Sequence, residues 1–191
     1  KYIMTQYSRP DNDKVDGSWE NQAGSATNMY ASINLASEDD SKYIKDPSNM
    51  GSPNTCEFYL DDVTDPGGAS SSWASLPVLK IRNKEGGGMG NTTQLDVVLF
   101  QDSTTIRTFT PHNPTTSIDD TPIGTLTTTQ ADSLTATDGD FQNLYLRITG
   151  LDAMGAGASI FIYRVWIEFP DAPAPAAAAQ NGSAFMLFLD T

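Results

Sequence analysis

Few side chains in this sequence could act in nucleophilic or metal chemistry, and His112 and Cys56 are its only histidine and cysteine. His112 lies in the segment PHNP, which is typical of a loop, so we expect an exposed polar residue there. A Ser-His-Asp triad would need a nucleophile-elbow motif, which the sequence lacks, and zinc would need several Cys or His ligands. In the alternating segment 55–60, Cys56 shares the inward face with Phe58 and Leu60, which favours a buried, inert thiol. We therefore predict a protein that is not an enzyme, with no catalytic residue, cofactor or metal ion.

Carboxylates are abundant, but their spacing does not single out a catalytic pair. They cluster at residues 38–40, 61–65, 119–120 and 138–140. A glycosidase needs two acids that face each other across a cleft, and no two of these stand out. Asp138 and Asp140 form a D-x-D pattern of the kind that binds calcium, but the other ligands of a calcium loop are missing. We expect solvated acids in turns.

Four aromatic residues could recognise a ligand or a partner: Trp19, Trp73, Trp166 and Tyr59. Together they could form a platform on which sugar rings stack. They could equally lie in the core or at a subunit interface, where Trp and Tyr are enriched. We favour the interface interpretation.

Strands must position these side chains, and the clearest strands are in residues 95–109, LDVVLFQDSTTIRTF. Leu95, Val97 and Leu99 alternate with other residues, the period of two expected of a half-buried strand. Residues 101–103 include Asp and Ser, which favour a turn. An isolated hairpin is only marginally stable in water, so other strands must complete its sheet.

The rest of the sequence predicts more strands and no long helix. A helical turn with Thr129 as its N-cap is expected at residues 129–132. Strands are expected at residues 29–33, 55–60, 78–84, 123–129, 141–149 and 159–169. Because strands and helices do not alternate, we predict an all-β fold, an antiparallel two-sheet β-sandwich of jelly-roll type.

We expect three parts: an extended N-terminal arm (1–53), the β-sandwich (54–170), and a Pro/Ala linker with a terminal apolar strand (171–191). The arm is polar with isolated aromatic residues, so it should lie on the sandwich or on a neighbour. The segment AFMLFL would aggregate if left in water, so it should pair within its own sheet or with another subunit. The expected interface residues are Tyr2, Tyr7, Trp19, Trp73, Phe185, Met186, Leu187, Phe188 and Leu189.

The charge of the chain excludes some partners. It has 11 basic and 24 acidic residues, a formal net charge of −13. Nucleic acids need clustered Lys and Arg, so we expect no nucleic-acid partner. No apolar run reaches the roughly 18 residues of a membrane span, so we expect no membrane partner either.

Several motifs together resemble a known family. They include CEFYLDDVTDPG, LKIRNKEGGG, LDVVLFQDSTTIRTF, TTTQADSLTATDGDFQNLYLRITG and RVWIEFPDAP. In this order they resemble a β-sandwich domain of tailed-bacteriophage and prophage virion structural proteins, over about residues 9–173. The resemblance implies a non-enzymatic structural protein. The segment 70–75 and the Pro/Ala tail depart from the family pattern.

The resemblance leads us to expect a capsid decoration (cement) protein on the outer surface of the virion capsid. Its partners would be the major capsid protein and its own copies, as a homo-oligomer that by analogy with other decoration proteins would be a trimer. A tail or fibre component with a receptor-binding role, and a carbohydrate-binding module, are the alternatives.

Overall fold

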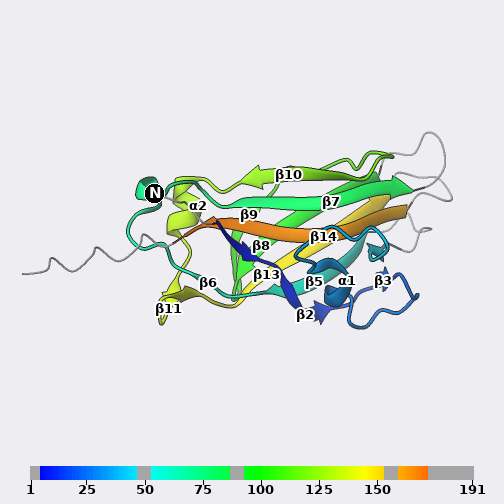
Figure 1. Cartoon of the computed structure of the whole chain (residues 1–191), viewed down its shortest axis with the longest axis horizontal. Helices are drawn as coiled ribbons and strands as arrows, with labels where there is room; N and C mark the ends of the chain where they lie inside the picture. Colours follow the sequence, from blue (N-terminus) through cyan, green and yellow to red (C-terminus); the bar gives the residue numbers. More distant parts are fainter. Residues whose placement is uncertain (1–4, 47–52, 87–92, 153–158, 172–191) are drawn as a thin grey trace, which may run out of the picture.

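The computed structural model describes residues 5–46, 53–86, 93–152 and 159–171, and in them two antiparallel sheets pack face to face. The predicted all-β sandwich is thus confirmed. The first sheet faces the viewer in Figure 1 and has six strands. Its strands are β1 (Thr5–Ser8), β3 (Glu20–Asn21), β4 (Ile44–Lys45), β7 (Val78–Gly86), β10 (Asp119–Thr125) and β14 (Ser159–Pro170).

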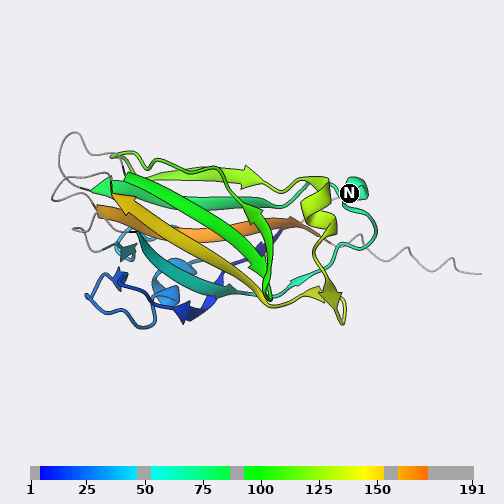
Figure 2. The same ribbon diagram turned by 180° about the vertical axis from the view of Figure 1, so that it is seen from behind.

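The second sheet has five strands and faces the viewer in Figure 2. Its order is β2-β5-β13-β8-β9. The bounds are β2 (Pro10–Val15), β5 (Asn54–Leu60), β8 (Thr93–Gln101), β9 (Thr104–Thr108) and β13 (Leu144–Asp152). The consecutive strands β7 and β8 lie in opposite sheets, where they pair with β14 and β13. The finer jelly-roll assignment stays a prediction.

One end of the sandwich is closed by a small third sheet and two short helices (Figure 1). The small sheet contains β6 (Val63–Thr64), β11 (Ala136–Thr137) and β12 (Asp140–Phe141), and the helices are η1 (Ser70–Ser72) and α2 (Thr128–Asp132). The helical turn predicted here is present, but its N-cap is Thr127 rather than Thr129. The Thr127 side chain and Gln130 form a capping box.

The core forms because apolar residues alternate along the central strands. In β8 and β13, Leu99 lies opposite Leu146, and Val97 opposite Ile148. All four side chains are fully buried between the sheets. Burial of an aliphatic side chain of this size contributes about 1.5–3 kcal/mol, so these buried pairs account for much of the stability.

The N-terminal region differs from the extended arm that we expected. β1 pairs with β14 in the six-stranded sheet, and β2 pairs with β5 in the five-stranded sheet. The chain therefore crosses between the sheets at Arg9, and residues 5–46 belong to the sandwich. The sequence did not indicate this because both strands lie at sheet edges, where polar side chains are tolerated.

The strand expected at residues 29–33 is also wrong, because α1 (Tyr30–Ile33) is helical. The carboxylate of Asp13, in β2, caps this helix from outside. It accepts hydrogen bonds from the backbone N–H groups of Met29 at 2.8 Å and Tyr30 at 2.7 Å. N–H groups at a helix start have no partner within the helix, so Asp13 supplies the missing acceptor.

Candidate interaction surfaces

The two residues considered for nucleophilic chemistry, Cys56 and His112, are buried or hydrogen-bonded within the fold. Cys56 is fully buried, as predicted, and burial raises the pKa of its thiol well above the ordinary value. His112 is not the free loop residue that we expected. Its backbone pairs with Leu95, and its Nε2 lies 3.2 Å from the Oδ1 of the buried Asn83. Burial lowers the pKa of His112, so the ring is suited to a neutral, hydrogen-bonded role.

The acidic clusters occupy turns or pair with cations. Asp138 and Gly139 have φ angles of 54° and 90° and form the tight turn between β11 and β12. Two consecutive positive φ angles are typical of a two-residue hairpin turn. Across the ranges that the structure describes, no group of three or more His, Cys, Asp or Glu side chains could hold a metal ion.

Arg82 on β7 forms ion pairs with two of the other acidic clusters, residues 38–40 and 119–120. Its guanidinium lies 2.8 Å from Asp40, 3.3 Å from Asp120 and 3.5 Å from Glu38. The hydrogen bond to Asp40 is the largest influence that raises the pKa of Arg82. These contacts attach residues 38–40 to the outer face of the six-stranded sheet, so the acids serve to position a loop.

The four aromatic residues considered as a sugar platform lie apart, which corrects that possibility. Trp19 is fully buried in the core. Trp73 packs beside Phe141 at the closed end of the sandwich, with its Nε1 donating to the Gly67 carbonyl at 3.0 Å. Trp166 and Tyr59 belong to different sheets.

A different aromatic group crosses the outer face of the five-stranded sheet. We call Tyr59, Tyr145 and Phe100 the aromatic row. They are direct cross-strand neighbours on β5, β13 and β8. Phe100 and Tyr145 are stacked, with ring centroids 4.7 Å apart, and Tyr59 meets Tyr145 edge-on at 6.3 Å. Contacts of this kind stabilise a sheet beyond the area that they bury.

Cations cover two of these three rings. The Nζ of Lys14 lies 3.9 Å from the Tyr145 centroid, and the guanidinium of Arg147 lies 4.7 Å from that of Phe100. Both cations also bind Glu57, whose carboxylate lies 2.6 Å from the Nε of Arg147. Tyr145 and Phe100 are consequently only 6% and 8% exposed. The row therefore offers Tyr59 as its one half-exposed ring, which is too little for a stacking platform.

Glu57 connects this surface and should make stability depend on pH. Burial alone would raise its pKa, but hydrogen bonds from Lys14 and Arg147 lower it overall. A lowered pKa means that Glu57 stabilises the fold above its unfolded-state pKa of about 4.3, and that this contribution is lost as the pH falls through the folded-state pKa.

We expect Glu57→Gln to lower the free energy of unfolding by about 1–2 kcal/mol at pH 7, because two charge-assisted hydrogen bonds are weakened. The difference from the wild type should shrink at pH 3. Urea unfolding at both pH values measures it. Glu85→Gln is the matched control, since Glu85 forms no ion pair in the described ranges. A loss at Glu57 that is equal at both pH values would contradict the assignment.

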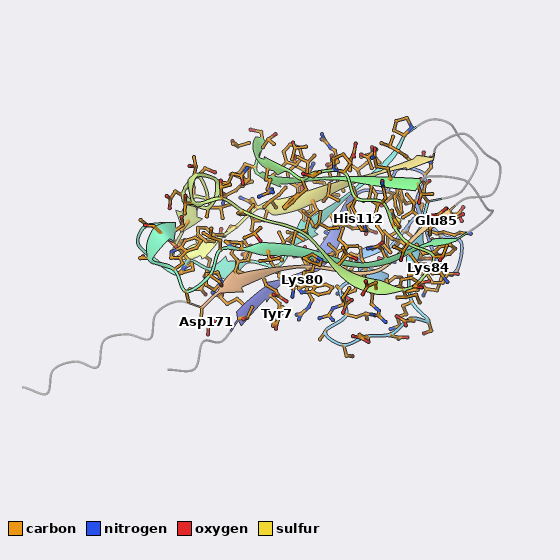
Figure 3. The ribbon with its side chains drawn as sticks, turned by 90° about the horizontal axis from the view of Figure 1, so that it is seen from above. Tyr7, Lys80, Lys84, Glu85, His112 and Asp171 are labelled. Atoms are coloured by element: carbon orange, nitrogen blue, oxygen red, sulfur yellow. The ribbon has the colours of Figure 1, made fainter. Side chains whose placement is uncertain are left out.

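The outer face of the six-stranded sheet carries Tyr7, the most exposed of the predicted interface residues that the structure describes. Tyr7 on β1 is 42% exposed and lies opposite Glu168 on β14. Glu168 accepts a hydrogen bond from Trp166 at 3.0 Å and pairs with Lys80 at 2.9 Å. Figure 3 shows Tyr7 and Lys80 on the same layer of the sandwich. Tyrosine is one of the residue types that are enriched at protein-binding surfaces.

The predicted interface residues therefore separate into three groups. Tyr7 is exposed, and Trp73 is partly exposed at the closed end. Trp19 is wrong as an interface residue, because its ring is fully buried within its own chain. The others lie outside the described residues: Tyr2, Phe185, Met186, Leu187, Phe188 and Leu189.

The two ends of the described chain lie side by side. Thr5, the first described residue, pairs with Pro170, and Asp171 is the last. The segments 1–4 and 172–191 thus start from neighbouring strand ends, close to Tyr7. Within the described part of the chain, no helix has the length and apolarity that crossing a bilayer requires.

Comparisons with known proteins assign no family to this chain. No model of a known protein family matches it, and no curated protein matches it.

Proposed function

We propose that this chain is a virion structural protein of a tailed phage, a capsid decoration protein that binds the major capsid protein and its own copies. The family resemblance of its motifs suggests the virion. The observation that carries the attachment is the pairing of Thr5 with Pro170, which starts both terminal segments at one point of the surface beside the exposed Tyr7.

The mechanism that we propose is physical. A two-layer body packed around a continuous core holds its shape while terminal segments reach neighbouring subunits. The segment 184–189, AFMLFL, has the composition of a strand that adds to another sheet. Several weak links from one body raise the effective concentration of each, so binding becomes tight without any large single interface.

Deletion of residues 184–191 tests this proposal. We expect the shortened protein to fold, because the two sheets lie within residues 5–171, and to occupy far fewer sites when it is added to particles that lack it. Copies per particle are counted by quantitative mass spectrometry, and circular dichroism verifies the fold. Full occupancy by the shortened protein would overturn the attachment model.

The same count separates the head from the tail. A decoration protein should be present in hundreds of copies per particle, in rough proportion to the shell subunits that it binds. A tail or fibre component should be present in few copies. The carbohydrate-binding alternative has less support, because cations cover two rings of the aromatic row.

A further inference from the structure

Two arginines on the outer face of the six-stranded sheet, Arg9 and Arg164, form no ion pair with a described carboxylate. Lys14, Lys45, Lys80, Arg82 and Arg147 each have a carboxylate oxygen within 4.0 Å. Arg9 and Arg164 have none among the residues described, as is also true of Lys42, Lys84 and Arg107. What sets Arg9 and Arg164 apart is that the Nε of each is shielded from solvent and has no hydrogen-bond partner in the described chain.

The strand register brings these two arginines to one place. Tyr7 lies opposite Glu168 and Ser8 opposite Ile167, where the pairing of β1 with β14 ends, and Arg9 is the next residue of the chain. Ser8 is fully buried and Tyr7 is exposed, so alternation directs Arg9 to the outer face with Tyr7. The guanidinium of Arg164 lies 4.1 Å from the Trp166 centroid, and that of Arg9 lies 4.9 Å from the Tyr7 centroid. Two cations, each resting on an aromatic ring, thus share one patch.

One nitrogen of each guanidinium, the Nε, lacks a hydrogen-bond partner among the described residues. The Nε atoms of Arg9 and Arg164 are shielded from solvent, and neither has a hydrogen-bond acceptor in the described chain. The Nη2 of Arg164 donates to the Ala36 carbonyl at 3.3 Å. A shielded charged donor without an acceptor is costly, so such a group calls for an explanation.

The nearby carboxylates are Asp61, which acts on Arg9, and Glu168, which is influenced by Arg164, but neither forms an ion pair with these arginines within 4.0 Å. Burial and then the charge of Arg164 lower the pKa of Arg9, against an opposing influence of Asp61. Glu168 is already bound by Lys80 and Trp166. The two guanidinium charges act on each other unfavourably, and an anion bound between them would be attracted by both.

We propose that Arg9 and Arg164 form a binding site for an oxyanion group, a carboxylate, sulfate or phosphate, between Tyr7 and Trp166. Planar guanidiniums suit this chemistry because their forked N–H groups match two oxygens of one anion. The aromatic rings beneath them hold the guanidiniums in place and leave their outer nitrogens to the ligand. The site does not depend on the proposed function.

Titration of the full chain with sodium acetate, sulfate and phosphate tests the site, with sodium chloride at equal ionic strength as reference. The Nε–Hε resonances of the arginines are followed by ¹⁵N NMR, which suits Arg9 and Arg164 because their shielded Nε–Hε protons exchange slowly with water. We expect saturable shifts at these two residues, and smaller, non-saturating ones at Arg82 and Arg147. Non-saturating shifts alike at all four, an adventitious ion only, would overturn the proposal.

Variants make the test specific to the pair. Arg164→Gln should weaken the saturable response of Arg9 by about tenfold or more, because one half of the clamp is lost. Lys84→Gln is the control. Lys84 likewise has no ion pair within the ranges that the structure describes, but it lies far from Tyr7 on the same sheet (Figure 3). If Arg164→Gln does not fold, Arg9→Gln is read through the resonance of Arg164. An unchanged response in the arginine variant would show that the pair is not a site.

The three oxyanions then define the ligand class. Saturation by acetate as well as sulfate fits a carboxylate-bearing ligand, whereas saturation by sulfate and phosphate alone fits a tetrahedral anion. Both results support the site, since both require the two guanidiniums. Binding of none of the three would overturn it.

Discussion

Replacement of Trp19 by alanine is expected to lower the free energy of unfolding by about 3–5 kcal/mol, the range for removal of a buried aromatic side chain. Trp19 is fully buried, and its Nε1 donates a hydrogen bond to the Asn54 carbonyl at 3.1 Å. A Cβ built on Gly150 would lie 3.2 Å from the indole ring, so Trp19 packs closely against β13. Truncation would leave a cavity between the N-terminal region and both sheets.

The measurement is chemical unfolding of Trp19→Ala and Tyr7→Ala side by side. Tyr7 is 42% exposed, so Tyr7→Ala should change stability by less than about 1 kcal/mol. The two aromatic residues come from the same polar part of the sequence, yet one should affect folding and the other attachment. Near-wild-type stability of Trp19→Ala would mean that residues 5–46 fold independently of the sandwich.

Tyr7 and Trp19 show which parts of the fold a sequence pattern can predict and which it cannot. Alternation identifies the central strands, because a strand with one buried face must alternate: Val97, Leu99, Leu146 and Ile148 are all buried on the faces that the pattern predicts. The edge strands β1 and β2, TQYS and PDNDKV, have no such alternation. Their placement depends on backbone pairing and on isolated large residues of the N-terminal region, of which Trp19, Met29, Ile33 and Ile44 are fully buried and which no periodic pattern reveals.

The candidate surfaces were harder to predict than the fold, because they depend on register. Tyr59, Tyr145 and Phe100 are far apart in sequence and meet only because β13 pairs with both β5 and β8. A shift of one residue would turn every ring to the other face. The same holds for Arg9 and Arg164, which come together because β1 pairs with the end of β14. Sequence alone supplied the residue types, and pairing supplied their proximity.

The second large effect is expected at Gly17, in the connection between β2 and β3. Gly17 has a φ of 61°, and a Cβ at this position would lie 1.9 Å from the Thr55 carbonyl oxygen in β5. The left-handed backbone alone costs a non-glycine residue about 1–2 kcal/mol. The collision is with backbone, which cannot rotate away as a side chain could, so the connection must lift off β5. We expect Gly17→Ala to lower the free energy of unfolding by about 3–5 kcal/mol in total.

Gly24→Ala is the matched control, because it separates the collision from the backbone strain. Gly24 has a similar φ of 75°, but a Cβ there would meet nothing within 4 Å. Its alanine variant should lose only the strain, about 1–2 kcal/mol. The difference between the two variants, measured by urea unfolding, is therefore the cost of relieving the collision with β5. Equal losses would contradict the close approach of Gly17 to the Thr55 carbonyl.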